Sequence, residues 1–179
     1  MIYSGFRRGE MCGLTWSDID FDNHIITVNK ALYQITDKGA VLDTPKTSAS
    51  NRSLKLGDEV FKYLMRLQDF YKERRTLLGT KYQDNDFVFK REDGNVISPL
   101  APNMWLHRFC EREGLRYVTP HSFRHLAASL MIESGASVKT VQSCLGQSEE
   151  KTTLDIYAHA FSKAQAKASE AIASNFKLA

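Results

Sequence analysis

The spacing of apolar residues changes from a strand-like to a helix-like repeat between Leu56 and Asp58, and this change limits the class of fold. Between positions 24 and 56 the chain is rich in Ile, Val and Thr and is broken by Asp37-Lys38-Gly39, a pattern typical of antiparallel strands joined by turns. From Asp58 onward, apolar residues recur every three or four positions, which is the repeat of amphipathic helices. The sequence therefore predicts an α+β fold that is mostly helical and contains a small antiparallel sheet.

Glycine and proline residues mark the expected ends of the helices. A short helix is predicted from Phe6 to Trp16, and a long one is predicted to be capped by Asp58 and to stop at Gly79. Ser98-Pro99 and Thr119-Pro120 open two further helices, because proline is favoured in the first helical turn. Later stops are predicted at glycines 114, 135 and 146. We expect Lys46 near a hairpin turn of the single small sheet.

Composition narrows the kind of partner without identifying it. The 179 residues are 42% hydrophobic, enough for one domain core, which excludes a disordered tail or a small disulfide scaffold. Lys and Arg number 24 against 21 for Asp and Glu, so the net charge of +3 favours anionic partners. Cys12, Cys110 and Cys144 have no zinc-site spacing and are interpreted as reduced thiols. No apolar run approaches the roughly 20 residues of a membrane span.

His121 and Arg124 form the most informative motif. Three positions apart on a helix, they share a face and can address one anion. An arginine offers a planar fork of donors that fits two phosphate oxygens, and a histidine can donate or accept a proton near neutral pH. An isolated pair of this kind is more often a helix-end residue beside a solvated charge. The pair is therefore informative only together with other motifs.

Two further motifs lie toward the ends of the chain. Arg7 and Glu10 are also three positions apart, so the carboxylate can hold the guanidinium in one pose. Tyr157 lies ten positions after Gln147, which directly follows Leu145-Gly146. A tyrosine in an Ile-Tyr-Ala context is by default a core or boundary residue. Tyr157 alone therefore does not predict chemistry.

Taken in order, these motifs resemble the catalytic domain of the tyrosine recombinases, the phage-integrase family. The resemblance rests on G-F-R-x-G-E, P-K-T before a strand, H-x-x-R, L-G-x-S and T-T-x-x-x-Y, and it runs from Tyr3 to about Phe161. It implies six catalytic positions and one supporting position, namely Arg7, Lys46, His121, Arg124, Gln147 and Tyr157, with Glu10 in support.

The resemblance also implies a role for each group. Arg7 and Arg124 bind the scissile phosphate, Lys46 protonates the leaving 5′ oxygen, and Tyr157 is the nucleophile. Two guanidiniums can stabilise the extra charge of a pentacoordinate phosphorus in place of a metal, so we expect no metal and no cofactor. The family usually has histidine or sometimes tryptophan where this chain has Gln147, which can donate a hydrogen bond but cannot shuttle a proton.

The expected partners follow from the same resemblance. They are double-stranded DNA, further copies of the chain in a tetrameric synapse, and an accessory directionality factor. We expect no membrane partner and a location at DNA in the bacterial cytoplasm. The start of the chain predicts that residues 1–179 are a catalytic domain without the N-terminal DNA-binding domains of such proteins. Two alternatives stay open: a non-catalytic DNA-binding remnant and a type IB topoisomerase.

Three surface features allow two interpretations each. Two basic rows either follow a DNA backbone or form solvated helix faces. They comprise Lys62, Arg66, Lys72, Arg74 and Arg75 in the first row and Arg108, Arg112 and Arg116 in the second. The apolar stripe of the last predicted helix either packs on its own domain or docks onto a neighbouring protomer; its residues are Ala164, Ala168, Ile172 and Phe176.

Overall fold

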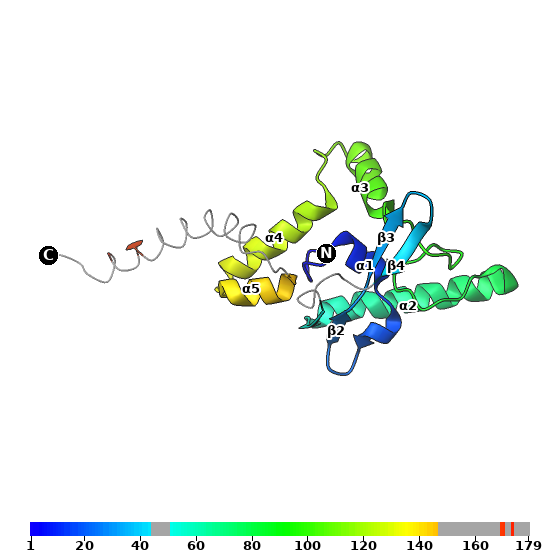
Figure 1. Ribbon diagram of the computed structural model, residues 1–179, viewed down its shortest axis with the longest axis horizontal. Coiled ribbons are helices and arrows are strands. Elements are labelled where there is room, and N and C mark those ends of the chain that lie inside the picture. Colours follow the sequence, from blue (N-terminus) through cyan, green and yellow to red (C-terminus); the bar gives the residue numbers. More distant parts are fainter. Residues whose placement is uncertain (44–50, 147–168, 171–172, 174–179) are drawn as a thin grey trace.

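The computed structural model describes residues 1–43, 51–146, 169–170 and 173, and the mostly helical α+β fold is confirmed (Figure 1). Its helices are α1 (Arg8–Gly13), α2 (Asp58–Leu78), α3 (Ala101–Arg112), α4 (Pro120–Glu133) and α5 (Val138–Leu145). Its strands are β1 (Ile19–Asp20), β2 (Ile25–Val28), β3 (Ala31–Ile35), β4 (Gly39–Asp43) and β5 (Arg52–Lys55). Within these ranges, no helix is both long and apolar enough to cross a membrane.

The strands form two antiparallel sheets, so the expectation of a single sheet was wrong. One sheet has the order β1-β2-β5, with Ile26 opposite Leu54, and the other pairs β3 with β4, with Leu32 opposite Leu42. Both edges of β2 are taken, by β1 and β5, so β3 does not continue the sheet beside β2 and pairs instead with β4 across the turn that joins them. The strands that flank Lys46 in the sequence therefore belong to different sheets.

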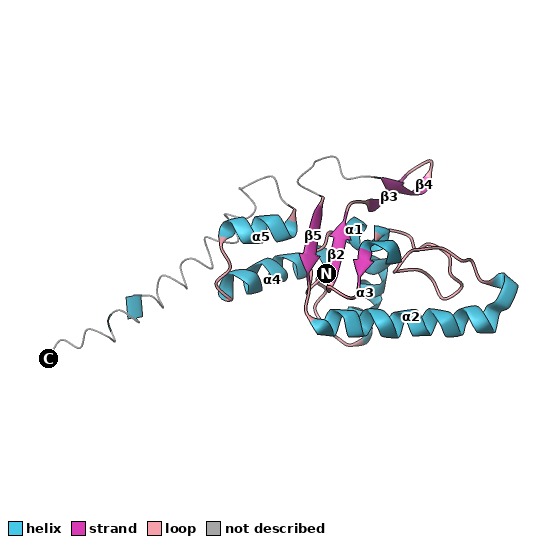
Figure 2. Ribbon diagram, turned by 90° about the horizontal axis from the view of Figure 1, so that it is seen from below, coloured by secondary structure: helices cyan, strands magenta, loops and turns pink. Residues whose placement is uncertain are grey.

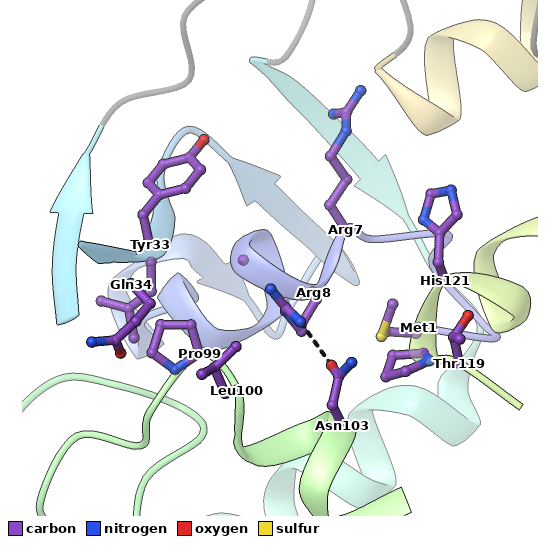
Figure 3. A pocket seen from close by; sticks show the side chains of 13 residues that line it. Met1, Arg7, Arg8, Tyr33, Gln34, Pro99, Leu100, Asn103, Thr119 and His121 are labelled. Atoms are coloured by element: carbon purple, nitrogen blue, oxygen red, sulfur yellow. Dashed lines mark hydrogen bonds between the residues drawn. The ribbon is translucent and has the colours of Figure 1, made fainter. Parts of the chain in front are cut away.

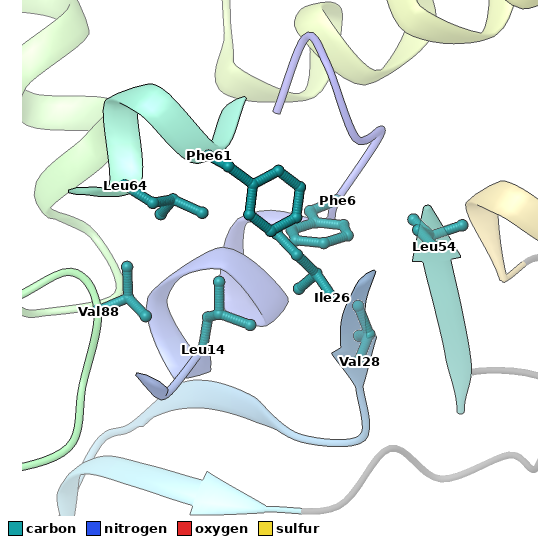
Figure 4. Packing of buried hydrophobic residues seen from close by; sticks show 8 residues of the cluster. All are labelled: Phe6, Leu14, Ile26, Val28, Leu54, Phe61, Leu64 and Val88. Atoms are coloured by element: carbon teal, nitrogen blue, oxygen red, sulfur yellow. The ribbon is translucent and has the colours of Figure 1, made fainter. Parts of the chain in front are cut away.

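The main core lies between α2 and the three-stranded sheet (Figure 4). Phe61 and Leu64 from α2 pack in this cluster with Ile26 and Val28 from β2. The remaining buried members of this cluster are Phe6, Leu14, Leu54 and Val88. Gly57 caps α2 in place of the expected Asp58, which is the first helical residue. Gly79, at φ 51°, ends the helix, so the predicted stop is confirmed.

A second, smaller apolar cluster joins α4 and α5. These helices lie side by side in both views, away from the far end of α2 (Figures 1 and 2). Ala128 of α4 packs against Val141 and Leu145 of α5, and all three are buried. Gly146 has the left-handed φ of 61° that ends α5, which confirms the predicted stop. The α4–α5 pair thus forms its own small core beside the main one.

Two glycines bring α1 against the backbone of β3. A Cβ atom on Gly9 would lie 2.9 Å from the carbonyl oxygen of Leu32, and one on Gly13 would lie 2.9 Å from the Leu32 nitrogen. Four positions apart, the two glycines share one face of the helix. The predicted helix from Phe6 to Trp16 is shorter in the structure, because the chain becomes extended at Leu14. This close contact holds β3 near the residues that precede α1.

Candidate active site

Arg7 lies directly before α1, and Glu10 in the first turn of that helix holds the Arg7 side chain. Arg7 Nη1 donates to Glu10 Oε1 at 2.7 Å, and the Arg7 backbone N–H donates to Glu10 Oε2 at 2.8 Å. Arg7 Nη2 donates to the carbonyl oxygen of Gly146, 2.8 Å away at the end of α5. Glu10 is buried, whereas 41% of the Arg7 side chain is exposed. The guanidinium is thus fixed on its protein side and open to solvent on the other.

Glu10 has a second cationic partner, Arg52 on β5, which the sequence reasoning missed. Arg52 Nη2 donates to Glu10 Oε2 at 2.8 Å, and Arg52 Nη1 donates to Glu10 Oε1 at 3.2 Å. Burial alone would raise the pKa of Glu10. The hydrogen bonds and charge of Arg52, and then the bonds from Arg7, outweigh burial and hold that pKa below its ordinary value. Glu10 is therefore a carboxylate shared by two guanidiniums.

The signal for Arg52 was present in the alternation of β5. Arg52 and Leu54 are buried, and Ser53 and Lys55 are exposed, so the arginine takes the same face as a core leucine. An arginine on the buried face of a strand needs an anionic or hydrogen-bonding partner. This period-of-two pattern could have identified it from the sequence.

Arg124 on α4 has only 2% of its surface exposed. Its Nη1 donates to the carbonyl oxygen of Gly5, and its Nη2 donates to that of Leu145 at 2.8 Å. Burial, and then the positive charge of Arg7, lower the pKa of Arg124 to about 10, which leaves it charged at neutral pH. The structure therefore brings Arg124 near Arg7, on the buried side of the site.

An open cavity of about 650 Å³ lies in front of these groups (Figure 3). Its polar lining comes from α1, β3, α3 and α4 and includes Arg7, Arg8, Tyr33, Gln34, Asn103 and His121. Arg7 and His121 point to the same side, and Arg8 Nη1 donates to Asn103 Oδ1 at 2.8 Å, which links α1 to α3. In the part of the chain that the structure describes, the cavity lining contains no Asp or Glu. Its charge and donors suit an anion.

His121 is the titratable group of this cavity. Partial burial of its ring lowers its pKa below the ordinary value, and the charges of His125, Arg124 and Arg7 lower it further. The imidazole rings of His121 and His125 meet edge to face, with centroids 4.5 Å apart. His121 is therefore mostly neutral at pH 7 and able to accept a proton. Whereas Arg124 is buried, His121 is exposed, so the two residues contribute to the site from different depths.

Three of the predicted site residues lie outside the described residues: Lys46, Gln147 and Tyr157. The same is true of all four residues of the apolar stripe predicted near the C-terminus. Residues 1–43, 51–146, 169–170 and 173 contain no group of three or more His, Cys, Asp or Glu side chains placed to hold a metal ion.

The basic rows have acidic neighbours in the structure. On α2, Lys62 pairs with Glu59, Lys72 with Asp69, Arg74 with Glu92 and Arg75 with Asp84. These pairs favour the interpretation of a solvated helix face. In the second row Arg112 pairs with Glu113, and Arg116 lies beyond the end of α3, so the row is not one continuous helix face.

Comparison with known proteins places this arrangement in a family. Residues 1–164 match the model of the phage integrase family, so the chain belongs to that family. It is 29% identical to a XerC-like tyrosine recombinase of Caldanaerobacter subterraneus subsp. tengcongensis, covering 94% of this chain and 46% of the relative. It is 30% identical to the ICEBs1 integrase of Bacillus subtilis strain 168, covering 90% of this chain and 44% of the relative. The chain thus spans less than half the length of these relatives.

Solved structures share the fold. The Tn1549 transposon integrase in complex with transposon right end DNA matches with a TM-score of 0.74 and 27% identity, covering 94% of this chain and 56% of that one. The XerA recombinase matches with a TM-score of 0.68 and 25% identity, covering 93% of this chain and 54% of the other.

Proposed function

We propose that this protein is the catalytic domain of a site-specific DNA recombinase, which cleaves and rejoins DNA through a 3′-phosphotyrosyl intermediate. One observation carries the proposal: Arg7, with Arg124 behind it, and a neutral His121 meet at a cavity whose described lining has no carboxylate. Such a site suits a phosphodiester that gains negative charge in the transition state. The family membership and the DNA complex of the Tn1549 integrase support double-stranded DNA as the substrate.

The proposed reaction uses this chain's own groups. The Tyr157 hydroxyl oxygen attacks the phosphorus, and a bond to that oxygen forms as the bond to the 5′ oxygen breaks. A tyrosine with its ordinary pKa of about 10 needs help to lose its proton, and the neutral His121 beside two arginines supplies an acceptor in a cationic field. Lys46 protonates the departing 5′ oxygen. Attack by another 5′ hydroxyl then reverses these steps and rejoins the strand.

Arg7 and Arg124 contribute different parts of the stabilisation. Arg7 presents its open side to the cavity, where its remaining N–H groups can meet phosphate oxygens. Arg124 lies deeper, where its charge acts through a medium that screens it less than water does. The supporting role of Glu10 is to keep Arg7 in this pose. Assembly into a tetramer, the accessory directionality factor and the DNA-associated location stay predictions.

The alternatives have less support. A non-catalytic remnant would leave the open side of Arg7 without a role, because the contacts with Glu10 and Gly146 use only the other side of its guanidinium. The type IB topoisomerase would use the same chemistry, but the named relatives are recombinases and integrases.

The decisive experiment captures the covalent intermediate. A duplex with a nick near the scissile phosphate is incubated with the 179-residue protein, and denaturing electrophoresis detects a protein–DNA adduct. Tyr157→Phe removes only the hydroxyl, so we expect the variant to fold and adduct formation to disappear. The parent protein should form the adduct equally well with EDTA. Capture by the Phe variant, or loss of capture in EDTA, contradicts the proposed mechanism.

A further inference from the structure

Three arginines from three elements bind the last carbonyl oxygens at the end of α5. Arg52 Nε donates to Cys144 at 2.7 Å, Arg124 Nη2 donates to Leu145 at 2.8 Å, and Arg7 Nη2 donates to Gly146 at 2.8 Å. The last carbonyls of a helix have no partner within it and carry the negative end of the helix dipole. Cationic donors therefore suit this position.

Arg52 repeats the contacts of Arg7 from the buried side. Both guanidiniums bind the Glu10 carboxylate and a carbonyl at the end of α5. The two side chains differ in exposure, because only 5% of the Arg52 side chain is exposed against 41% for Arg7. Arg52 thus cannot reach a substrate in the cavity, and it does not line that cavity. Any effect of Arg52 on a reaction must pass through the groups that it holds.

The charges show what Arg52 supplies. Glu10 and Arg7 alone form a neutral pair, and the carboxylate would cancel the charge that Arg7 offers to an anion. With Arg52 as a second counter-ion, the three groups together carry one net positive charge. The Arg52 Nε bond also fixes the end of α5, and the chain runs from there to Gln147 and Tyr157.

We propose that Arg52 is a positioning residue for strand cleavage, which neutralises Glu10 so that Arg7 keeps its charge for the phosphate and which fixes the end of α5. The inference rests on the proposed function for its catalytic part. Its structural part concerns α5 alone. An ion pair that served only folding would change the stability of the protein and leave the reaction rate of the folded molecules unchanged.

The first arm of the test measures cleavage. Single-turnover adduct formation is followed with excess protein at several protein concentrations. These measurements give the limiting rate and, separately, the protein concentration that gives half of that rate. In Arg52→Met we expect the limiting rate to fall about tenfold to a hundredfold, as for groups that orient an active-site ligand, with half-saturation within about twofold of the parent. Arg52→Lys restores part of the rate. The matched control, Arg75→Met, removes an exposed arginine–carboxylate pair on α2 and leaves the rate unchanged.

A double-mutant cycle tests the route through Glu10. If Arg52 acts by neutralising this carboxylate, its replacement by Met costs less in a Glu10→Gln background than in the parent. Equal losses in the two backgrounds would overturn the electrostatic part of the proposal. A normal limiting rate in folded Arg52→Met would overturn the positioning role as a whole.

The second arm does not depend on activity. Hydrogen exchange followed by mass spectrometry reports on peptides from α5 and, as an internal control, from α2. We expect α5 amides to exchange about tenfold faster in Arg52→Met, because the Cys144 carbonyl loses a charged donor. If Arg52→Met does not fold, hydrogen exchange is measured in Arg52→Lys instead, because lysine keeps the charge and lacks Nε. Unchanged exchange in α5 refutes the structural part, even if the parent protein forms no adduct and the proposed function itself fails.

Discussion

Replacing Glu10 with glutamine tests how much of the fold depends on the carboxylate shared by Arg7 and Arg52. Glu10 is 3% exposed and accepts four hydrogen bonds from these two residues. Glutamine keeps the shape but removes the charge and turns one acceptor into a donor that faces other donors. Breaking a buried ion pair costs about 3–5 kcal/mol. We expect Glu10→Gln to lower the free energy of unfolding by about this amount.

The effect has a defined dependence on pH. The pKa of Glu10 is lower in the folded protein than its ordinary value, so the carboxylate stabilises the fold above the pKa of the unfolded chain. This stabilisation is lost as the pH falls through the folded pKa. The difference in unfolding free energy between parent and Glu10→Gln is therefore full at pH 7 and narrows in acid.

Urea unfolding at pH 7 and at successively lower pH measures this difference. Asp69→Asn is the matched control, because Asp69 belongs to an exposed pair with Lys72 in the middle of α2, and we expect no measurable change. A Glu10→Gln protein as stable as the parent at pH 7 would refute the reasoning. So would a loss of stability that stays constant as the pH falls.

Variants at two further positions test other parts of the molecule. Gln147→His should speed single-turnover adduct formation and Gln147→Ala should slow it, because a hydrogen bond to a charged group contributes about 1.5–3 kcal/mol. Equal rates in the parent and both variants would mean that position 147 does not contact the transition state. Tyr71→Phe should lower the free energy of unfolding in urea by about 1–3 kcal/mol, since the Tyr71 hydroxyl donates to the Lys90 carbonyl at 2.7 Å and accepts from its N–H at 3.2 Å. Adduct formation should stay normal in Tyr71→Phe. An unchanged urea midpoint would contradict the stabilising role of the Tyr71 hydrogen bonds.

Local signals in the sequence predicted the helices well. Gly79 and Gly146 end α2 and α5 with positive φ, and Thr119-Pro120 opens α4, because each residue acts on the backbone next to it. The division of the strands into two sheets was not predictable in this way. It depends on β5 returning to the free edge of β2, which is a contact between distant parts of the chain.

The candidate site was predictable only in part for the same reason. Arg7 with Glu10, and His121 with Arg124, are neighbours on one helical turn, so spacing alone placed each pair. Arg52 is 42 positions from Glu10, and no spacing rule reaches that far. The depth of Arg124 also depends on distant groups, since its partners are the carbonyls of Gly5 and Leu145.

The close approach of α1 and β3 determines which part of the cavity a side chain can alter. Leu32 backbone atoms lie 2.9 Å from the place that a Cβ on Gly9 or Gly13 would take, so the spacing between this helix and strand is a distance between backbones. Changes at Tyr33 or Gln34 would alter the chemistry of the wall without moving it. An alanine at Gly9 would instead force α1 and β3 apart, and both elements line the cavity beside Arg7. A change of activity in that variant would report the spacing of this helix and strand, because position 9 offers no reactive side chain.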